Sequence, residues 1–204
     1  STTSSDAWLN VKAGTDAALA MAMGHVILKE YYIDKETPYF KEYAKEFTDM
    51  PFLVRVEDIN GTVQPGRFLN AKDLGRQEEG ADFQMVVIDE TTNEIVIPNG
   101  TMGERHTHPE KWNLRLENRD TGAKIDPRLS VFDQREDVTV VKLPYFGDEE
   151  HEGVIERAIP TITVQTVDGP VKVTTVYDLI LANYGIDRGI GGEVAKAYTD
   201  DTPY

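Results

Sequence analysis

Apolar side chains are most densely gathered between residues 17 and 32, where alanine, methionine and leucine predict a long α-helix. Up to Gly24 they cover most of the circumference, which predicts that this helix is largely buried. Thr15, just before the helix, is a candidate N-cap residue. Upstream, residues 7–11 alternate between apolar and polar positions, as in a short strand. The pattern at this end is therefore a strand, a glycine-containing turn and a helix.

The rest of the chain alternates between short apolar runs and turn residues. A helix is predicted for residues 38–47, with Pro38 in its first turn, and another for residues 177–184, ending at Gly185 as a C-cap. Strands are predicted at residues 52–56, 67–69, 84–89, 94–97, 138–143, 161–167 and 171–176. Turns are predicted at Asn60-Gly61 and at residues 90–93 and 168–170, and a turn of helix begins at residues 71–74. This order predicts an α/β fold, a mixed sheet with flanking helices and long loops, without a doubly wound pattern.

The 204 residues contain no internal repeat or low-complexity tract, but one long stretch is loop-like. Residues 98–153 are rich in Gly, Asp, Asn and Pro, and the run at 138–143 is the exception. We therefore expect three portions: an α/β portion over residues 1–97, a loop-rich insertion over residues 98–153, and a hairpin and helix over residues 154–204 that return to the α/β core.

The composition argues against several classes of function. The chain has 36 acidic and 21 basic residues, and its net charge of −15 disfavours nucleic acid and anionic lipid as partners. It has no cysteine, which excludes disulfides and thiolate-bound clusters within it. No apolar run reaches the roughly 18–20 residues that cross a bilayer, so we expect no direct membrane insertion. Because the chain begins at Ser1 rather than Met, we expect an internal piece of a larger protein.

The sharpest local feature is the turn Gly14-Thr15-Asp16 in front of the long helix. A helix N-terminus presents unpaired amides and a partial positive charge, and glycine lets a ligand approach closely. A carboxylate there would repel a phosphate, whereas the two-donor edge of guanine pairs with a carboxylate through charge-assisted hydrogen bonds. The turn therefore fits a guanosine-containing ligand better than a bare phosphate. An ordinary capped helix is the commoner use of such residues, with Asp16 contributing about 0.3–1 kcal/mol to the first turn.

Longer stretches carry a family resemblance. VKAGTDAALAMAMGHVI (residues 11–27) resembles the segment of molybdenum bis-(molybdopterin guanine dinucleotide) oxidoreductases that contacts one guanosine arm of the cofactor. Within this superfamily, that of dimethyl sulfoxide reductase, further stretches resemble the alpha subunits of respiratory, membrane-bound nitrate reductases: EYAKEFTDMPFLVRVE (42–57), PNGTMG (98–103), EKWNLRLE (110–117), LPYFG (143–147) and TTVYDLILANYGIDRG (174–189). The stretch at residues 104–108 departs from the more aromatic sequence expected after PNGTMG.

The resemblance implies a role in reducing nitrate to nitrite at molybdenum, with electrons passing through the bis-molybdopterin guanine dinucleotide cofactor. Residues 1–97 would then be the cofactor-binding portion, with Gly14, Thr15 and Asp16 against a guanosine arm, and the fold an incomplete part of the large-subunit fold. The molybdenum ligand and an iron–sulfur cluster are expected elsewhere in the full subunit, so this chain alone is expected to be inactive. Implied partners are the remainder of the alpha subunit, an iron–sulfur beta subunit and a membrane haem subunit, through which the protein associates with the membrane.

Two other functions are consistent with the residues. Nitrite oxidoreductase uses the same scaffold in the opposite direction, and selenate, chlorate and perchlorate reductases are more distant relatives. A free-standing, non-catalytic α/β binding domain is the alternative from a different class, and it predicts a chain that folds cooperatively alone. A segment of a larger subunit predicts instead an exposed apolar face over residues 17–27.

The remaining polar candidates favour structural roles. His106 and His108, with Glu104, Glu110 and His151, lack the spacing of a four-ligand metal set and are interpreted as exposed loop residues. His25 is interpreted as a hydrogen-bonded core histidine. The acidic run at residues 148–152 is typical of a solvated loop. Tyr177 and Asp178 are adjacent on a helix and do not face each other, so capping and packing are favoured over proton transfer. Residues 185–192 lack the preceding strand of a dinucleotide fingerprint.

Overall fold

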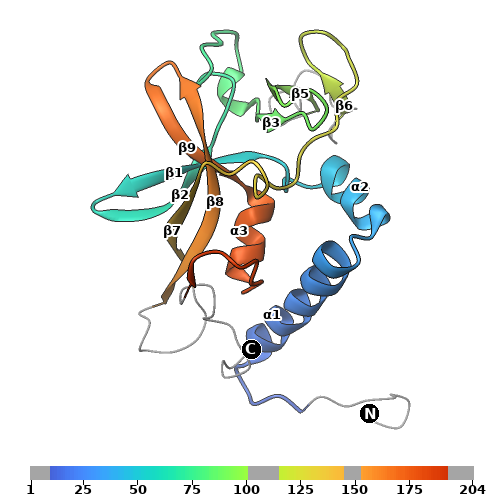
Figure 1. The fold of residues 1–204 in the computed structure, drawn as a ribbon, viewed down its shortest axis with the longest axis vertical. Helices are drawn as coiled ribbons and strands as arrows, with labels where there is room; N and C mark the ends of the chain where they lie inside the picture. The colour runs from blue at the N-terminus through green and yellow to red at the C-terminus, as the bar shows by residue number, and fades with distance from the viewer. Residues whose placement is uncertain (1–9, 101–114, 145–152, 193–204) are drawn as a thin grey trace.

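The centre of the molecule is a five-stranded sheet in the order β2-β1-β9-β8-β7 (Figure 1). The computed structural model describes residues 10–100, 115–144 and 153–192. The strands of this sheet are β1 (Leu53–Ile59), β2 (Thr62–Phe68), β7 (Asp137–Pro144), β8 (Val154–Thr166) and β9 (Gly169–Thr175). All of their pairings are antiparallel, and the edge strands β2 and β7 contact each other because the sheet curls. The predicted α/β class is confirmed, but the sheet is antiparallel and not mixed, because its strands are joined through hairpin-type pairings.

Two hairpins of the sheet follow from local turn chemistry. Asn60 and Gly61 both have positive φ angles, 57° and 80°, as a two-residue turn between twisted strands requires, and the predicted turn is confirmed. The hairpin predicted around residues 168–170 is also confirmed, as β8 and β9. β8 pairs with β7 up to Thr161 and with β9 from Ile162 onward. Pro160, which lacks an N–H, lies just before this change of partner.

Helix α3 (Val176–Asn183) follows β9 directly and is capped at both ends. At its start the Thr175 hydroxyl accepts a hydrogen bond from the Asp178 N–H (3.1 Å). At its end Gly185 has a φ of 72°, its N–H bonds the Ala182 carbonyl, and the Ile186 N–H bonds the Leu181 carbonyl. This is the Schellman arrangement, so the predicted C-cap at Gly185 is confirmed.

The helix predicted for residues 17–32 is present, but its geometry changes within it. α1 (Asp16–Ile27) continues into a π-helical segment, η2 (Leu28–Asp34), before α2 (Pro38–Phe47) begins as predicted. The prediction that α1 is buried is wrong for this chain. None of its residues is buried, and Met23 is 51% exposed. An all-round apolar composition indicates that a helix needs cover, and here α3 contacts only one side of it (Figure 1).

The remaining elements are short. β3 (Val87–Ile88) pairs with β4 (Ile95–Val96), and β5 (Pro98–Asn99) pairs with β6 (Arg115–Asn118), which the sequence did not predict. η3 (Ala81–Phe83) is a single 3-10 turn. The strands predicted at residues 84–89 and 94–97 are therefore shorter than expected. The strand predicted at residues 7–11 lies largely outside the described residues, and Asn10 and Val11 are not in a strand.

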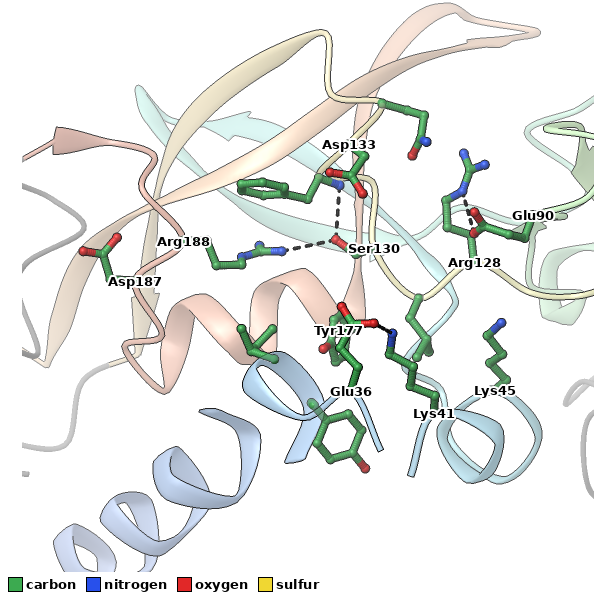
Figure 2. Close-up of a pocket in the computed structure, with 15 residues that line it drawn as sticks. Glu36, Lys41, Lys45, Glu90, Arg128, Ser130, Asp133, Tyr177, Asp187 and Arg188 are labelled. Atoms are coloured by element: carbon green, nitrogen blue, oxygen red, sulfur yellow. Dashed lines mark hydrogen bonds and ion pairs between the residues drawn. The ribbon is translucent and has the colours of Figure 1, made fainter. Parts of the chain in front are cut away.

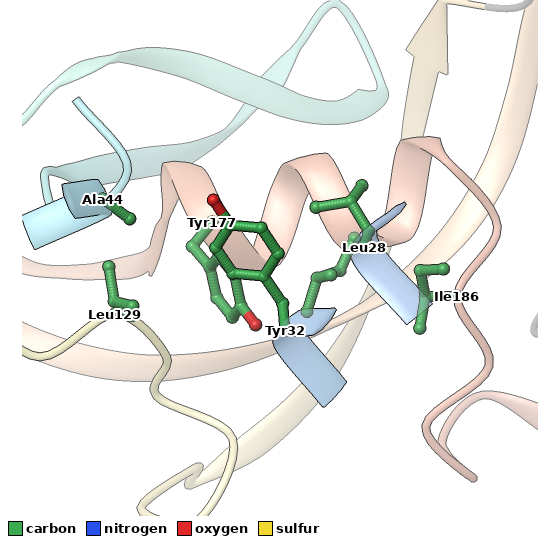
Figure 3. Packing of buried hydrophobic residues seen from close by; sticks show 7 residues of the cluster. Leu28, Tyr32, Ala44, Leu129, Tyr177 and Ile186 are labelled. Atoms are coloured by element: carbon green, nitrogen blue, oxygen red, sulfur yellow. The ribbon is translucent and has the colours of Figure 1, made fainter. Parts of the chain in front are cut away.

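Among the five apolar clusters of the described residues, three hold the larger elements together. One joins η2, α2 and α3 through Leu28, Tyr32, Ala44, Leu129, Tyr177, Leu181 and Ile186 (Figure 3). A second packs β1, β8 and β9 against residues 69, 86, 88 and 131. The third joins β7 and β8 to Ala182 of α3. Within the described part of the chain, no helix combines the length and apolarity needed to cross a membrane.

Candidate functional site

The turn predicted to bind a ligand is well formed. The backbone N–H and the hydroxyl of Thr15 both donate to the Lys12 carbonyl, at 3.1 and 2.8 Å. Gly14 has a φ of 86°, which glycine adopts without strain. Thr15 occupies the predicted N-cap position, and its carbonyl accepts from the N–H of Ala18, but its side chain makes no capping bond to the helix. The hydroxyl instead closes the turn that leads into α1.

This turn is open on its outer side. Gly14, Thr15 and Asp16 are all exposed, and a Cβ added at Gly14 would meet no atom within 4 Å. Asp16 is the first residue of α1, where the helix dipole favours a negative charge. A carboxylate, a hydroxyl and a stretch of backbone without a side chain are therefore all accessible in this turn.

His25 of α1 is held by a hydrogen bond. Its Nδ1 lies 2.7 Å from the carbonyl oxygen of Tyr184, which can only accept, so Nδ1 carries the proton. The side chain is half-buried. The hydrogen bond predicted for His25 is present, with a partner at the end of α3, but the prediction that His25 lies in the core is wrong, because no residue of α1 is buried.

Gly24, next to it, was not singled out by the sequence. A Cβ at this position would lie 2.2 Å from Cε1 of Tyr184, so the tyrosine ring lies directly on the helix backbone. A glycine inside a helix costs about 1 kcal/mol relative to alanine, which indicates a packing reason for its presence. A glycine inside a predicted helix was therefore the sequence signal for this contact, although it does not identify Tyr184 as the residue that packs there.

A cavity of about 540 Å³ lies between α2, the start of α3 and residues 128–134 (Figure 2). Four cations line it, and each has an acidic partner. The pairs are Lys41–Glu36 (2.8 Å), Lys45–Asp126 (2.5 Å), Arg128–Glu90 (2.9 Å) and Arg188–Asp178 (2.7 Å). An incoming anion would have to compete with these carboxylates. The lining does not include residues 14–16, so the cavity and the exposed turn are separate features.

Tyr177 and Asp178 have the structural roles that the sequence favours. Burial raises the pKa of Tyr177 well above its ordinary value, so the phenol stays protonated. Asp178 is fully buried and accepts hydrogen bonds from the Val131 N–H (2.9 Å) and the hydroxyl groups of Ser130 (2.6 Å) and Thr175 (2.9 Å). With Thr175 at the N-cap, Asp178 completes a capping arrangement. The expectation of capping and packing is confirmed.

The histidine-rich candidates lie outside the described residues: His106, His108 and His151, with Glu104 and Glu110. The acidic run at residues 148–152 lies there too. Among the residues whose structure is described, no group of three or more His, Asp or Glu side chains could hold a metal ion. The glycine-rich stretch after Gly185 follows a helix, and not the strand that a dinucleotide fingerprint needs.

Comparison with known proteins gives a consistent set of relatives, although no family model matches. The chain is 47% identical over 199 residues to the nitrate reductase alpha chain of Bacillus subtilis (strain 168), which covers 98% of this chain and 16% of that protein. It is 40% identical over 212 residues to the respiratory nitrate reductase 1 alpha chain of Escherichia coli (strain K12), covering 98% of this chain and 17% of that protein. The nitrate reductase alpha subunit of Mycobacterium tuberculosis (strain ATCC 25618 / H37Rv) is 39% identical over 201 residues, 97% of this chain and 16% of that protein. The chain therefore spans less than one fifth of the length of these relatives.

Proposed function

This chain belongs with the nitrate reductase alpha chains, and from that premise we propose that it is a cofactor-anchoring segment of the catalytic subunit of a molybdenum nitrate reductase. The observation that carries the proposal is the extent of the relationship: identities of 39–47% cover 97–98% of the chain. The names of these relatives support a role in nitrate reduction over a non-catalytic binding domain. When bound, molybdenum bis-(molybdopterin guanine dinucleotide) supplies the two-electron chemistry that converts nitrate to nitrite.

The turn Gly14-Thr15-Asp16 fits one guanosine arm of this cofactor. The guanine ring N–H and exocyclic amine form a two-donor edge that matches the two oxygens of the Asp16 carboxylate. Gly14 leaves the backbone uncovered, and nothing lies within 4 Å of its missing Cβ. Because the Thr15 hydroxyl already donates to Lys12, it can meet a ligand only as an acceptor. The chain's contribution is to hold and orient the cofactor, which places the metal relative to substrate and electron donors.

Partner subunits follow from the same proposal. The relatives are alpha chains, a designation that implies further subunits. We propose that an iron–sulfur beta subunit and a membrane haem subunit accompany the complete alpha subunit and attach it to the membrane. The three-portion organisation proposed from the sequence, with boundaries after residues 97 and 153, would let residues 1–97 carry the cofactor contact.

Asp16→Ala in the complete subunit is expected to weaken cofactor retention while leaving the helix intact. Loss of a charge-assisted hydrogen-bonded pair costs about 1.5–3 kcal/mol, which corresponds to roughly 10–150-fold faster loss of the cofactor. The helix-dipole contribution of Asp16 is smaller, about 0.3–1 kcal/mol, so circular dichroism should be unchanged. Molybdenum and guanine content, measured over time after desalting, checks the prediction.

Asp49→Ala is a matched control, because Asp49 is an exposed acid beyond the far end of α2. It should retain cofactor like the unmodified subunit. Asp16→Asn keeps the size of the side chain but presents a donor where guanine also donates, so it should lose the cofactor as Asp16→Ala does. Full molybdenum and guanine loading of Asp16→Ala, with unchanged activity, would remove Asp16 from the site.

A further inference from the structure

Helix α1 is anchored to the rest of the chain mainly beyond its C-terminal end. Its own residues are not buried, whereas Leu28 and Tyr32 of η2 are. Both belong to the cluster that contains Tyr177 and Leu181 of α3, and the rings of Tyr32 and Tyr177 lie 6.0 Å apart (Figure 3). The N-terminal half of α1, which leads to the Gly14-Thr15-Asp16 turn, therefore extends away from this anchor (Figure 1).

A second attachment of α1 lies closer to its N-terminal end than Leu28 and Tyr32 do. Gly24 and His25 meet Tyr184 in two independent ways: the tyrosine ring lies against the Gly24 backbone, and the tyrosine carbonyl accepts from His25 Nδ1 at 2.7 Å. Tyr184 is itself fixed as the C-cap residue of α3. Its N–H bonds the Ile180 carbonyl, and the Schellman turn at Gly185 follows it. Both partners thus belong to hydrogen-bonded backbone at or within a helix, so the contact holds one helix against the other.

Because α1 runs from this contact to the Gly14-Thr15-Asp16 turn, the contact determines where the helix places that turn. Asp16 lies eight residues from Gly24, about 12 Å along the helix axis, so a tilt of about 10° at Gly24 moves the turn by about 2 Å. A binding constellation tolerates displacements of about 0.5 Å. The anchor at Leu28 and Tyr32 holds one end, and a second contact nearer the turn is needed to fix the angle. Apolar packing alone would allow the helix to slide, whereas a hydrogen bond to one carbonyl sets its rotation and register.

We propose that Gly24, His25 and Tyr184 form a positioning brace that aims the Gly14-Thr15-Asp16 turn at its guanosine ligand. This inference rests on the proposed function, because it assigns these residues a role toward the same site. None of the three touches the ligand. They act through the angle and rotation of α1, and they couple the turn to α3 and through it to the curled sheet.

The test uses the complete subunit and follows the rate of molybdenum and guanine loss. His25→Phe keeps a ring but removes the donor, and it is expected to accelerate the loss roughly tenfold, the order associated with one hydrogen bond. His25→Asn places a side-chain N–H near the position of Nδ1 and should restore retention to within about twofold. Gly24→Ala, which forces a methyl group onto the Tyr184 ring, should resemble His25→Phe.

A double-mutant cycle separates positioning from general destabilisation. If His25 acts through Asp16, then His25→Phe has little further effect in an Asp16→Ala background. A merely structural loss would add to the effect of Asp16→Ala in full. Val96→Ala, which removes buried side-chain atoms from a cluster with Val87 and Ile125 that has no member in α1, η2 or α3, serves as control: it should lower the thermal midpoint without changing cofactor loss.

Each failure has a different signature. If Asp16→Ala retains the cofactor normally, the proposed guanosine site is wrong. If Asp16→Ala loses it while His25→Phe and Gly24→Ala do not, the site stands and the brace is wrong. Additivity in the cycle, or failure of His25→Asn to restore retention, also overturns the brace.

Discussion

Replacing Asp178 with alanine is expected to lower the free energy of unfolding of this chain by about 3–5 kcal/mol, because a buried ion pair that loses one partner leaves the other charge uncompensated. Asp178 is fully buried, and Arg188, which donates to it at 2.7 Å, is 10% exposed in its side chain. The substitution also leaves the buried Val131 N–H without its acceptor. Domains of this size are stable by only about 5–15 kcal/mol, so much of the total would be lost.

The effect is large because one carboxylate joins three parts of the fold. It caps α3 through Thr175, fixes the segment at Ser130 and Val131, and holds the segment after α3 through Arg188. Urea unfolding followed by circular dichroism, with the midpoint and slope compared, measures the change. Asp133→Ala, an exposed acid in the same segment as Ser130, is the matched control and should change stability by less than about 0.5 kcal/mol.

A second substitution separates the cost of leaving the Arg188 charge without a partner from the cost of lost packing. Arg188→Met in the Asp178→Ala background removes the uncompensated cation and should recover part of the stability, so the two changes are not additive. Full additivity, or a loss below about 1 kcal/mol for Asp178→Ala alone, would show that the network contributes little.

The features predicted correctly from the sequence are those encoded by adjacent residues. The Asn60-Gly61 turn, the hairpin before Gly169 and the Schellman end of α3 each depend on backbone preferences that a few neighbouring side chains determine. The exposed turn at Gly14 is of the same kind. Its accessibility agrees with a ligand site, while the ligand itself was inferred from the resemblance to the molybdopterin oxidoreductases.

The features that sequence reasoning missed depend on distant residues. The contact between His25 and Tyr184 joins positions 159 residues apart, and nothing near either one predicts the other. The π-helical geometry of η2 accompanies burial of Leu28 and Tyr32 against α3, which helix propensity does not encode. The exposure of α1 shows a related limit: apolar residues all round a helix predict that something covers it, without saying what.

Asp73 is the second position where substitution should have a large effect, and here the effect should depend on pH. This residue is 5% exposed, and its carboxylate accepts from Arg67 (2.7 and 2.5 Å), from Arg55 (3.1 Å) and from the Asn70 N–H (3.0 Å). Burial alone would raise the pKa of Asp73, but the hydrogen bonds from Arg67 and Asn70 outweigh it and hold the pKa below its ordinary value.

Asp73→Asn is expected to cost about 2–3 kcal/mol at pH 7, less than a fully buried pair because the Arg67 side chain is 50% exposed. Since the folded-state pKa is lowered, the carboxylate stabilises the fold above its unfolded-state pKa of 3.8, and this contribution is lost as pH falls through the folded value. The difference in free energy of unfolding between the two proteins should therefore be constant from pH 7 to about pH 5 and shrink below pH 4.

Urea unfolding at a series of pH values measures this difference, with exposed Asp82→Asn as control. A difference that stays constant down to pH 3 would mean that the shape of the side chain, and not its charge beside two arginines, accounts for its contribution.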